Sequence, residues 1–196
     1  MADVETLDDV ARRARACRLC PLPHEPRPVL RVSATARLLI VGQAPGTRVH
    51  ETGIPWNDPS GDRLREWLEM DRDAFYDQAR IAIMPMGFCF PGQDAKGGDL
   101  PPRRECAPAW HAPLRALMPD IRLTLLVGSY AQARYLDARR KASMTDTVRA
   151  FADYLPDRML PLPHPSWRNT AWLKRNPWFA AETLPALRRA VADLSR

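Results

Sequence analysis

The chain has 196 residues, of which 45% are hydrophobic, and its formal net charge is +6. This length and apolar content are enough to bury one substantial core, so we expect a single domain over residues 1–196 and exclude an intrinsically disordered protein. No apolar run approaches the roughly 20 residues that span a bilayer. Residues 1–5 are acidic and lack the apolar stretch of a secretory signal. We therefore expect a protein of the reducing cytoplasm, without a membrane partner.

The excess of basic residues favours a polyanionic partner. Lys and Arg number 29 against 23 Asp and Glu, and arginine supplies most of the positive charge. The planar guanidinium group suits phosphate, which makes nucleic acid the first candidate partner. An arginine-rich composition also arises from a GC-rich genome, so the charge alone does not decide the function.

The apolar pattern predicts alternating helices and strands. A helical pattern covers residues 6–17, and a buried strand over 36–42 ends on glycine. A helix then opens at residues 60–62, with Ser60 as its N-cap, and runs to Leu68. The remaining predicted elements are a strand at 79–84, a helix at 103–117, a strand at 122–128, a helix starting at Ser129, a strand at 158–162 and an amphipathic helix at 178–194.

Strands that are continuous apolar runs, alternating with helices, are typical of a parallel sheet covered on both faces. We therefore expect an α/β fold with three layers (α/β/α) around a central, mostly parallel four-stranded sheet. Ligand sites in such folds lie at the carboxyl ends of the strands. The loops at those ends are 43–59, 85–98, 129–130 and 163–169, and we expect the functional residues there.

The loop after the first predicted strand is rich in glycine and proline. Residues 42–46 read Gly-Gln-Ala-Pro-Gly, residues 52–56 read Thr-Gly-Ile-Pro-Trp, and residues 58–62 read Asp-Pro-Ser-Gly-Asp. Glycine next to a strand end lets the backbone approach a ligand closely. A tight turn without a ligand is the simpler interpretation of this loop taken alone.

A second loop follows the last predicted strand, where residues 163–169 read Pro-His-Pro-Ser-Trp-Arg-Asn. His164 lies between two prolines, which hold it stiffly and suit a catalytic or hydrogen-bond-donating role. Trp167 and Arg168 suit insertion into a base stack and contact with a phosphate. A polar surface loop is the alternative, so the functional argument depends on the two loops together.

Together these loops resemble the paired signatures of the uracil-DNA glycosylase superfamily, most closely its iron–sulfur branch, often called family four. There the first loop reads Gly-Glu-Ala-Pro-Gly and then Thr-Gly-x-Pro-Phe, and the second reads His-Pro-Ser or His-Pro-Ala. The motifs occur here in the same order, and the resemblance covers nearly the whole chain. It implies a DNA-repair glycosylase that hydrolyses the N-glycosidic bond of uracil, or of another deaminated base, in duplex or single-stranded DNA.

Four cysteines provide an independent indication. Cys17 and Cys20 form a C-x-x-C pair, followed at a distance by Cys89 and Cys106. Four thiolates in two pairs suit a [4Fe–4S] cluster or a tetrahedral zinc ion, and their spacing alone does not choose between these and four unrelated buried cysteines. The resembling iron–sulfur glycosylases carry a C-x-x-C near the N-terminus and a second pair at a similar interval. The resemblance therefore favours the [4Fe–4S] cluster, in a structural role.

The resemblance also implies roles for residues of the two loops. A base turned out of the duplex enters a pocket, and water attacks the anomeric carbon as the base departs. Gln43 lies in the water-handling loop, His164 is the candidate donor to the departing base, and Trp56 stands in the place of a stacking phenylalanine. The expected base pocket consists of Gly42, Ala44, Pro45, Gly46, Trp56 and Met86. The expected DNA contacts are Ser129, Ser166, Trp167, Arg168 and Asn169.

The sequence departs from the family pattern in three places. Gln43 replaces a glutamate, and a glutamine orients a water molecule but cannot take its proton. His50 stands where relatives often carry an acid, so it joins Gln43 and His164 as a catalytic candidate. Residues able to take the base role are His50, Glu51, Asp58 and Asp62, which the sequence does not rank. Residues 84–87 read Met-Pro-Met-Gly and lack the asparagine that reads uracil in relatives. Base recognition therefore relies on backbone groups, or the substrate is not uracil.

Several functions remain open from the sequence. They are a uracil glycosylase, a hypoxanthine or xanthine glycosylase, a non-catalytic iron–sulfur protein that binds nucleic acid, and a zinc-stabilised structural protein. We favour the enzyme because the stiffly held histidine and the aromatic pocket residue are both present. We expect it to act on DNA as a monomer.

Overall fold

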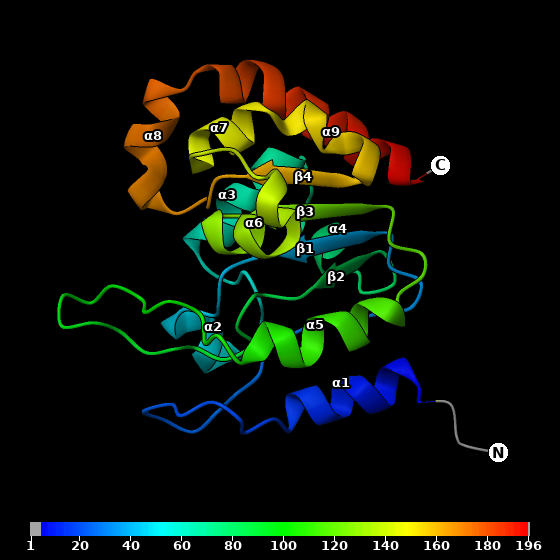
Figure 1. Cartoon of the computed structure of the whole chain (residues 1–196), viewed down its shortest axis with the longest axis vertical. Coiled ribbons are helices and arrows are strands. Elements are labelled where there is room, and N and C mark those ends of the chain that lie inside the picture. Colours follow the sequence, from blue (N-terminus) through cyan, green and yellow to red (C-terminus); the bar gives the residue numbers. More distant parts are fainter. Residues whose placement is uncertain (1–4, 196) are drawn as a thin grey trace.

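The computed structural model describes residues 5–195, and in it four parallel strands form one sheet in the order β2-β1-β3-β4 (Figure 1). The strands are β1 (Leu38–Val41), β2 (Ile81–Ile83), β3 (Leu123–Val127) and β4 (Met159–Leu162). In register, Ile40 of β1 pairs with Ile83 of β2 on one side and with Leu125 of β3 on the other. The direction of winding reverses between β1 and β3, which is where α/β sheets open a crevice for ligands.

Helices cover both faces of the sheet (Figure 1). Their bounds are α1 (Leu7–Arg15), α2 (Thr47–Thr52), α3 (Pro59–Leu68), α4 (Arg72–Tyr76), α5 (Cys106–Ala116), α6 (Ser129–Leu136), α7 (Met144–Arg149), α8 (Thr170–Arg175) and α9 (Leu184–Ala192). A π-helical turn, Phe179–Thr183, leads into α9. The helix α1 packs on the outside of α5. The predicted three-layer α/β/α fold with a parallel four-stranded sheet is confirmed.

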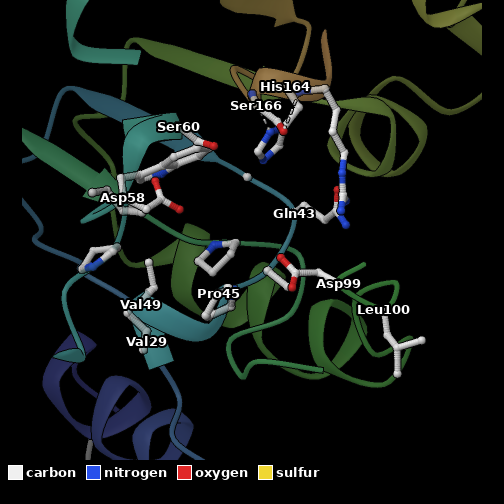
Figure 2. Close-up of a pocket in the computed structure, with 18 of the residues that line it drawn as sticks. Val29, Gln43, Pro45, Val49, Asp58, Ser60, Asp99, Leu100, His164 and Ser166 are labelled. Carbon is white, nitrogen blue, oxygen red and sulfur yellow. Dashed lines mark hydrogen bonds between the residues drawn. The ribbon is translucent and has the colours of Figure 1, made fainter. Parts of the chain in front are cut away.

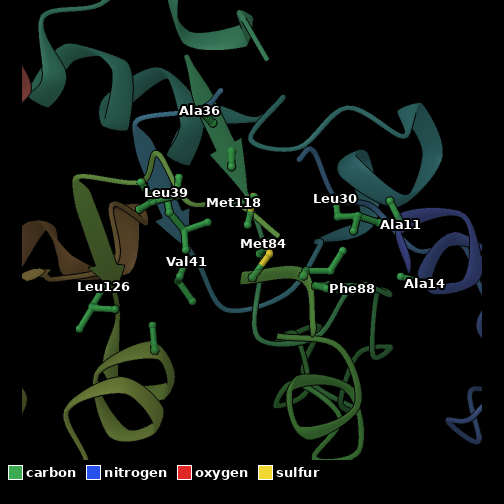
Figure 3. Packing of buried hydrophobic residues seen from close by; sticks show 14 of the residues in the cluster. Ala11, Ala14, Leu30, Ala36, Leu39, Val41, Met84, Phe88, Met118 and Leu126 are labelled. Atoms are coloured by element: carbon green, nitrogen blue, oxygen red, sulfur yellow. The ribbon is translucent and has the colours of Figure 1, made fainter. Parts of the chain in front are cut away.

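Each strand is buried on both faces because its side chains alternate between two separate cores. Leu39 and Val41 of β1 belong to the core beneath α1, α5 and α6 (Figure 3). Leu38 and Ile40 belong to the core beneath α3, α4, α7 and α9. This is why the strands read in sequence as continuous apolar runs. The two cores hold the sheet rigid and leave its carboxyl edge free to carry loops.

The strands and the first helix are each one to two residues shorter at one or both ends than predicted, and three other helices need correction. The helix expected to be capped by Ser60 begins at Pro59 and is capped by Asp58, whose carboxylate accepts the Gly61 N–H at 2.8 Å. The helix expected from residue 103 begins at Cys106, and the terminal helix is interrupted by the π-helical turn. Four helices were not predicted from the sequence, namely α2, α4, α7 and α8, which are five or six residues long. Such short helices depend on tertiary contacts.

No helix within residues 5–195 has the length and apolar character needed to cross a membrane.

Candidate active site

A cavity of about 300 Å³ opens at the carboxyl edge of the sheet, lined by residues that follow β1, β2 and β4 (Figure 2). The structure therefore brings the two sequence loops together around one hollow. The predicted site residues that line it are Gly42, Gln43, Ala44, Pro45, Gly46, Trp56, His164, Ser166, Arg168 and Asn169. A volume of this size suits a small organic group.

Trp56 forms one wall of the cavity and is held by two glycines. Its backbone has φ 58°, and its ring lies so close to Gly42 that a Cβ there would stand 2.7 Å from Trp56 Cζ2. A Cβ at Gly61 would stand 1.7 Å from the Trp56 carbonyl oxygen. The Trp56 and His164 ring centroids lie 5.6 Å apart at an interplanar angle of 34°. The glycines at both positions are therefore required for the ring to occupy this wall.

His164 follows β4 and faces the cavity (Figure 2). The backbone N–H of Ser166 donates to His164 Nδ1 at 3.2 Å, so the neutral ring carries its proton on Nε2. Burial lowers the pKa of His164 to about 4, and the ring is neutral at physiological pH. His164 thus offers the cavity a neutral N–H donor rather than a cationic imidazolium.

The loop that carries His164 is anchored at both ends. The Asn169 side-chain amide donates to the His164 carbonyl oxygen at 2.7 Å. From α3, the Arg63 guanidinium donates to the Ser166 carbonyl oxygen at 3.1 Å. These bonds hold the imidazole in place before any ligand arrives, which is the condition for effective electrostatic stabilisation of a developing charge.

The sequence comparison identifies the family to which a chain with this cavity belongs. A family model of the Uracil DNA glycosylase superfamily matches residues 31–188. The chain belongs to this superfamily. The match includes both cavity loops and all four strands. Membership associates the chain with DNA glycosylase-type chemistry, and the superfamily's glycosylases act on DNA.

Two residues that the glycosylase signatures suggested for the base role lie outside the cavity. The His50 ring packs 4.5 Å from the His24 ring and 5.7 Å from the Phe90 ring, measured between centroids. Burial lowers the pKa of His50. Glu51, exposed at the end of α2, does not line the cavity either. The expectation that His50 is a catalytic residue is therefore not supported by its position, because the fold turns its ring toward the loop after β2.

The two aspartates of the same candidate set differ in position. Asp62 points outward and pairs with Arg65 at 2.5 Å. Asp58 lines the cavity, and burial raises the pKa of its carboxyl. Its carboxylate oxygen Oδ1 is engaged as the α3 cap by the Gly61 N–H. Asp58 is thus an acid that lines the site, but its carboxylate is already oriented by capping α3.

Three further predicted residues do not line the cavity. Met86 packs against the core on the α5 side, because the β2 loop turns its side chain away from the hollow. Ser129 is exposed at the start of α6, and Trp167 is 74% exposed beside the cavity mouth. Both positions suit contact with DNA outside the base pocket, so their predicted DNA-binding roles stay predictions.

Pro85 lies in the stretch 84–87 that lacks the asparagine, and it has no backbone N–H. Its carbonyl oxygen accepts the His111 Nε2–H at 3.0 Å, and His111 Nδ1 accepts the Tyr135 hydroxyl at 2.9 Å. Burial lowers the pKa of His111 to about 4. The Pro85 carbonyl is therefore already engaged on the far side of the cavity wall, and His111 fixes the position of that wall.

Sequence reasoning missed a hairpin that lines the cavity from the side of β2. Residues 92–100 form a short hairpin whose ends are joined by the antiparallel bridge between Gln93 and Asp99. Asp99 and Leu100 line the cavity (Figure 2). The signal for it was present in residues 97–99, Gly-Gly-Asp, within and just beyond the loop after the second predicted strand. The acids that the sequence suggested, Glu51, Asp58 and Asp62, all lie in or next to the first loop.

The four cysteines line a second, small cavity between the N-terminal segment and the loop after β2. The Phe88 backbone N–H donates to Cys106 Sγ at 3.2 Å, and the Trp110 indole N–H donates to Cys17 Sγ at 3.3 Å. Burial raises the pKa of the Cys106 thiol to about 12 and that of Cys89 to about 11. The prediction that these residues converge on one place agrees with this geometry.

The arrangement of the cysteines bears on the group that they would hold. Within residues 5–195, no three His, Cys, Asp or Glu side chains are arranged to hold a single metal ion. Tetrahedral zinc requires four sulfurs at about 2.3 Å from one ion. In a cluster each thiolate binds a different iron, so the sulfurs stand further apart. Four thiols around one cavity, with N–H groups donating to two of them, are a donor set that suits either a [4Fe–4S] cluster or a zinc ion.

Proposed function

We propose that the protein is a DNA glycosylase that removes uracil from DNA. The observation that supports this most directly is the neutral His164, which lines a cavity walled by the Trp56 ring and whose Nδ1 already accepts the Ser166 N–H, leaving Nε2–H as the donor. A uracil that leaves as an anion carries its charge partly on a carbonyl oxygen. A fixed neutral donor stabilises that charge more as the bond breaks than before it, which is the condition for catalysis.

Other residues would then stack on the base, orient the attacking water and contact the DNA. Trp56 would stack on the extruded base, whose entry into the cavity requires it to leave the duplex. Gln43, on the loop after β1, would orient the attacking water through its side-chain amide. Arg168 and Asn169 line the cavity next to the exposed Trp167, where a DNA backbone would pass. Trp167 would fill the gap that the flipped base leaves.

The decisive experiment is base release from labelled oligonucleotides that contain one uracil opposite guanine, opposite adenine or in a single strand. Abasic sites are cleaved by alkali and the products are separated. We expect the wild-type protein to produce cleavage and His164→Ala to slow it by about 10²-fold or more while DNA affinity is largely kept. His50→Ala, which removes a histidine outside the cavity, is the matched control.

The outcomes separate the alternatives. Loss of DNA affinity together with activity in His164→Ala would make His164 a binding or structural residue. If the folded wild-type protein releases no uracil, the same assay with hypoxanthine and xanthine tests the other deaminated bases. Failure with all three would favour a protein that binds nucleic acid without catalysis.

We also propose that Cys17, Cys20, Cys89 and Cys106 hold a [4Fe–4S] cluster. It would join the N-terminal segment to the loop after β2, and the hydrolysis of a glycosidic bond needs no redox step from it. Protein purified without oxygen should absorb near ~400 nm, which a d¹⁰ zinc ion does not. Iron and sulfide analysis, with Cys17→Ser as the variant, checks the assignment. A colourless, fully stable wild-type protein with one zinc ion would contradict it.

A further inference from the structure

Two carboxylates line the cavity, those of Asp58 and Asp99. Asp58 accepts the Gly61 N–H as the cap of α3. Asp99 enters from the hairpin on the opposite side of the cavity from His164 (Figure 2). The site therefore has a second acid, and this one does not support a helix.

The hairpin places the Asp99 side chain firmly although it is exposed. The Leu100 N–H donates to the Gly92 carbonyl oxygen at 2.9 Å, which closes the hairpin at its base. At its tip, Asp94 Oδ1 accepts the Lys96 N–H at 2.8 Å and the Gly98 N–H at 2.9 Å. The hairpin is thus fixed by its own hydrogen bonds and does not depend on a ligand to become ordered.

The two oxygens of Asp99 have different surroundings. Oδ1 accepts the Gln93 side-chain amide at 3.3 Å. Oδ2 lies against the first cavity loop, where a Cβ added to Gly46 would stand 3.3 Å from it. One oxygen therefore orients the carboxylate, and the other is directed at the loop that also carries Gln43. Figure 2 shows Asp99 and Gln43 on the same side of the hollow.

We propose that Asp99 is the general base of the reaction, a role that rests on the proposed glycosylase function. Gln43 orients the water molecule but cannot accept its proton, whereas Asp99 can. The Asp99 carboxylate takes one proton from water, and the resulting oxygen bonds to the anomeric carbon. The electron pair of the N-glycosidic bond leaves with the base, whose negative charge the His164 N–H stabilises. The products are the free base and an abasic site.

The test is single-turnover base release by Asp99→Asn under saturating enzyme. Asparagine keeps an oxygen that accepts from Gln93, so the hairpin is retained while the basic group is lost. A general base contributes about 10²- to 10⁴-fold, and we expect a loss in that range without weaker DNA binding. In Asp99→Ala, added formate should restore part of the rate, because a small carboxylate can occupy the vacated space. A purely structural role would not respond to formate.

Asp94→Asn is the matched control, since it makes the same charge change in the same hairpin outside the cavity. Its rate should stay within about threefold of wild type, as for most surface substitutions. Asp58→Asn tests the competing acid. An Asp99→Asn rate near that of wild type, or a large loss confined to Asp58→Asn, would overturn the proposed role of Asp99 and leave the proposed glycosylase function standing. A wild-type protein that releases no deaminated base would overturn the proposed function and this role with it.

Discussion

The Arg27 guanidinium donates a hydrogen bond of 2.7 Å to the backbone carbonyl oxygen of Glu51, at the end of α2. It donates a second, of 2.9 Å, to the carbonyl oxygen of His50. Burial raises the pKa of the Cys89 thiol, and an interaction with the backbone N–H of Arg27 partly offsets this rise. Arg27 thus connects the cysteine cavity to α2, whose residue Val49 lines the active-site cavity. The N-terminal segment lies outside the matched family region, yet Arg27 supports the end of α2 and Val29 of the same segment lines the cavity.

Replacing Arg27 with methionine should loosen α2, because its last carbonyl groups lose their donor. Since the side chain is exposed, we expect the free energy of unfolding to fall by only about 1 kcal/mol. Hydrogen exchange of the α2 amides should become faster and base release slower. Arg15→Met, on the exposed side of α1, is the control. Unchanged exchange in α2 would show that the two bonds carry no structural role.

Gly42→Ala should displace the Trp56 ring and reduce base release, because the new Cβ would stand 2.7 Å from Cζ2. The double variant Gly42→Ala with Trp56→Phe should recover part of the activity, since phenylalanine lacks the outer ring atoms that collide. Single-turnover rates of the two single variants and the double variant check this coupling. If the losses of activity in the two single variants add up in the double variant, the effect of Gly42→Ala does not arise from contact with Trp56.

Trp167→Ala should slow base release from duplex DNA more than from single strands. The side chain is 74% exposed beside the cavity, and its proposed role is to fill the space left in the stack by the flipped base. A single strand has no such gap to fill, so it serves as the internal control. The measurement is the rate of base release from both substrates. An equal loss on duplex and single-stranded DNA would contradict the proposed role of Trp167 in filling the gap.

The buried His111 should make stability depend on pH. Burial lowers the pKa of His111 from 6.5 to about 4 on folding. Between these two values the unfolded chain therefore binds a proton at His111 and the folded chain does not. The contribution of His111 is complete above about pH 6.5 and is lost progressively as the pH falls toward 4, by at most about 3 kcal/mol. Urea unfolding between pH 7 and 5 should show a steeper decline for wild type than for His111→Gln. Parallel curves would mean that His111 titrates normally.

Much of the fold follows from local sequence. The four strands were predictable because both faces of each strand are buried, so their residues form continuous apolar runs such as Leu38–Val41. The alternation with helices then requires parallel strands, and parallel strands bring the loops at their carboxyl ends to one edge. For that reason the sequence alone predicted that residues 42–46 and His164 would meet, whereas only the family resemblance suggested that the four cysteines share one site.

The tertiary structure alone decided which of the candidate acids and histidines outside the two motifs line the cavity. Asp99 and His50 are both polar residues near motif loops, yet only Asp99 lines the hollow. Their orientation depends on long-range contacts: the hairpin that packs over Gly46, and the rings that draw His50 toward Phe90. Periodicity reports which face of an element is apolar, but the direction of a side chain in an irregular loop depends on contacts with residues far away in the chain. The sequence therefore located the site, and packing between distant segments selected the acid that faces it.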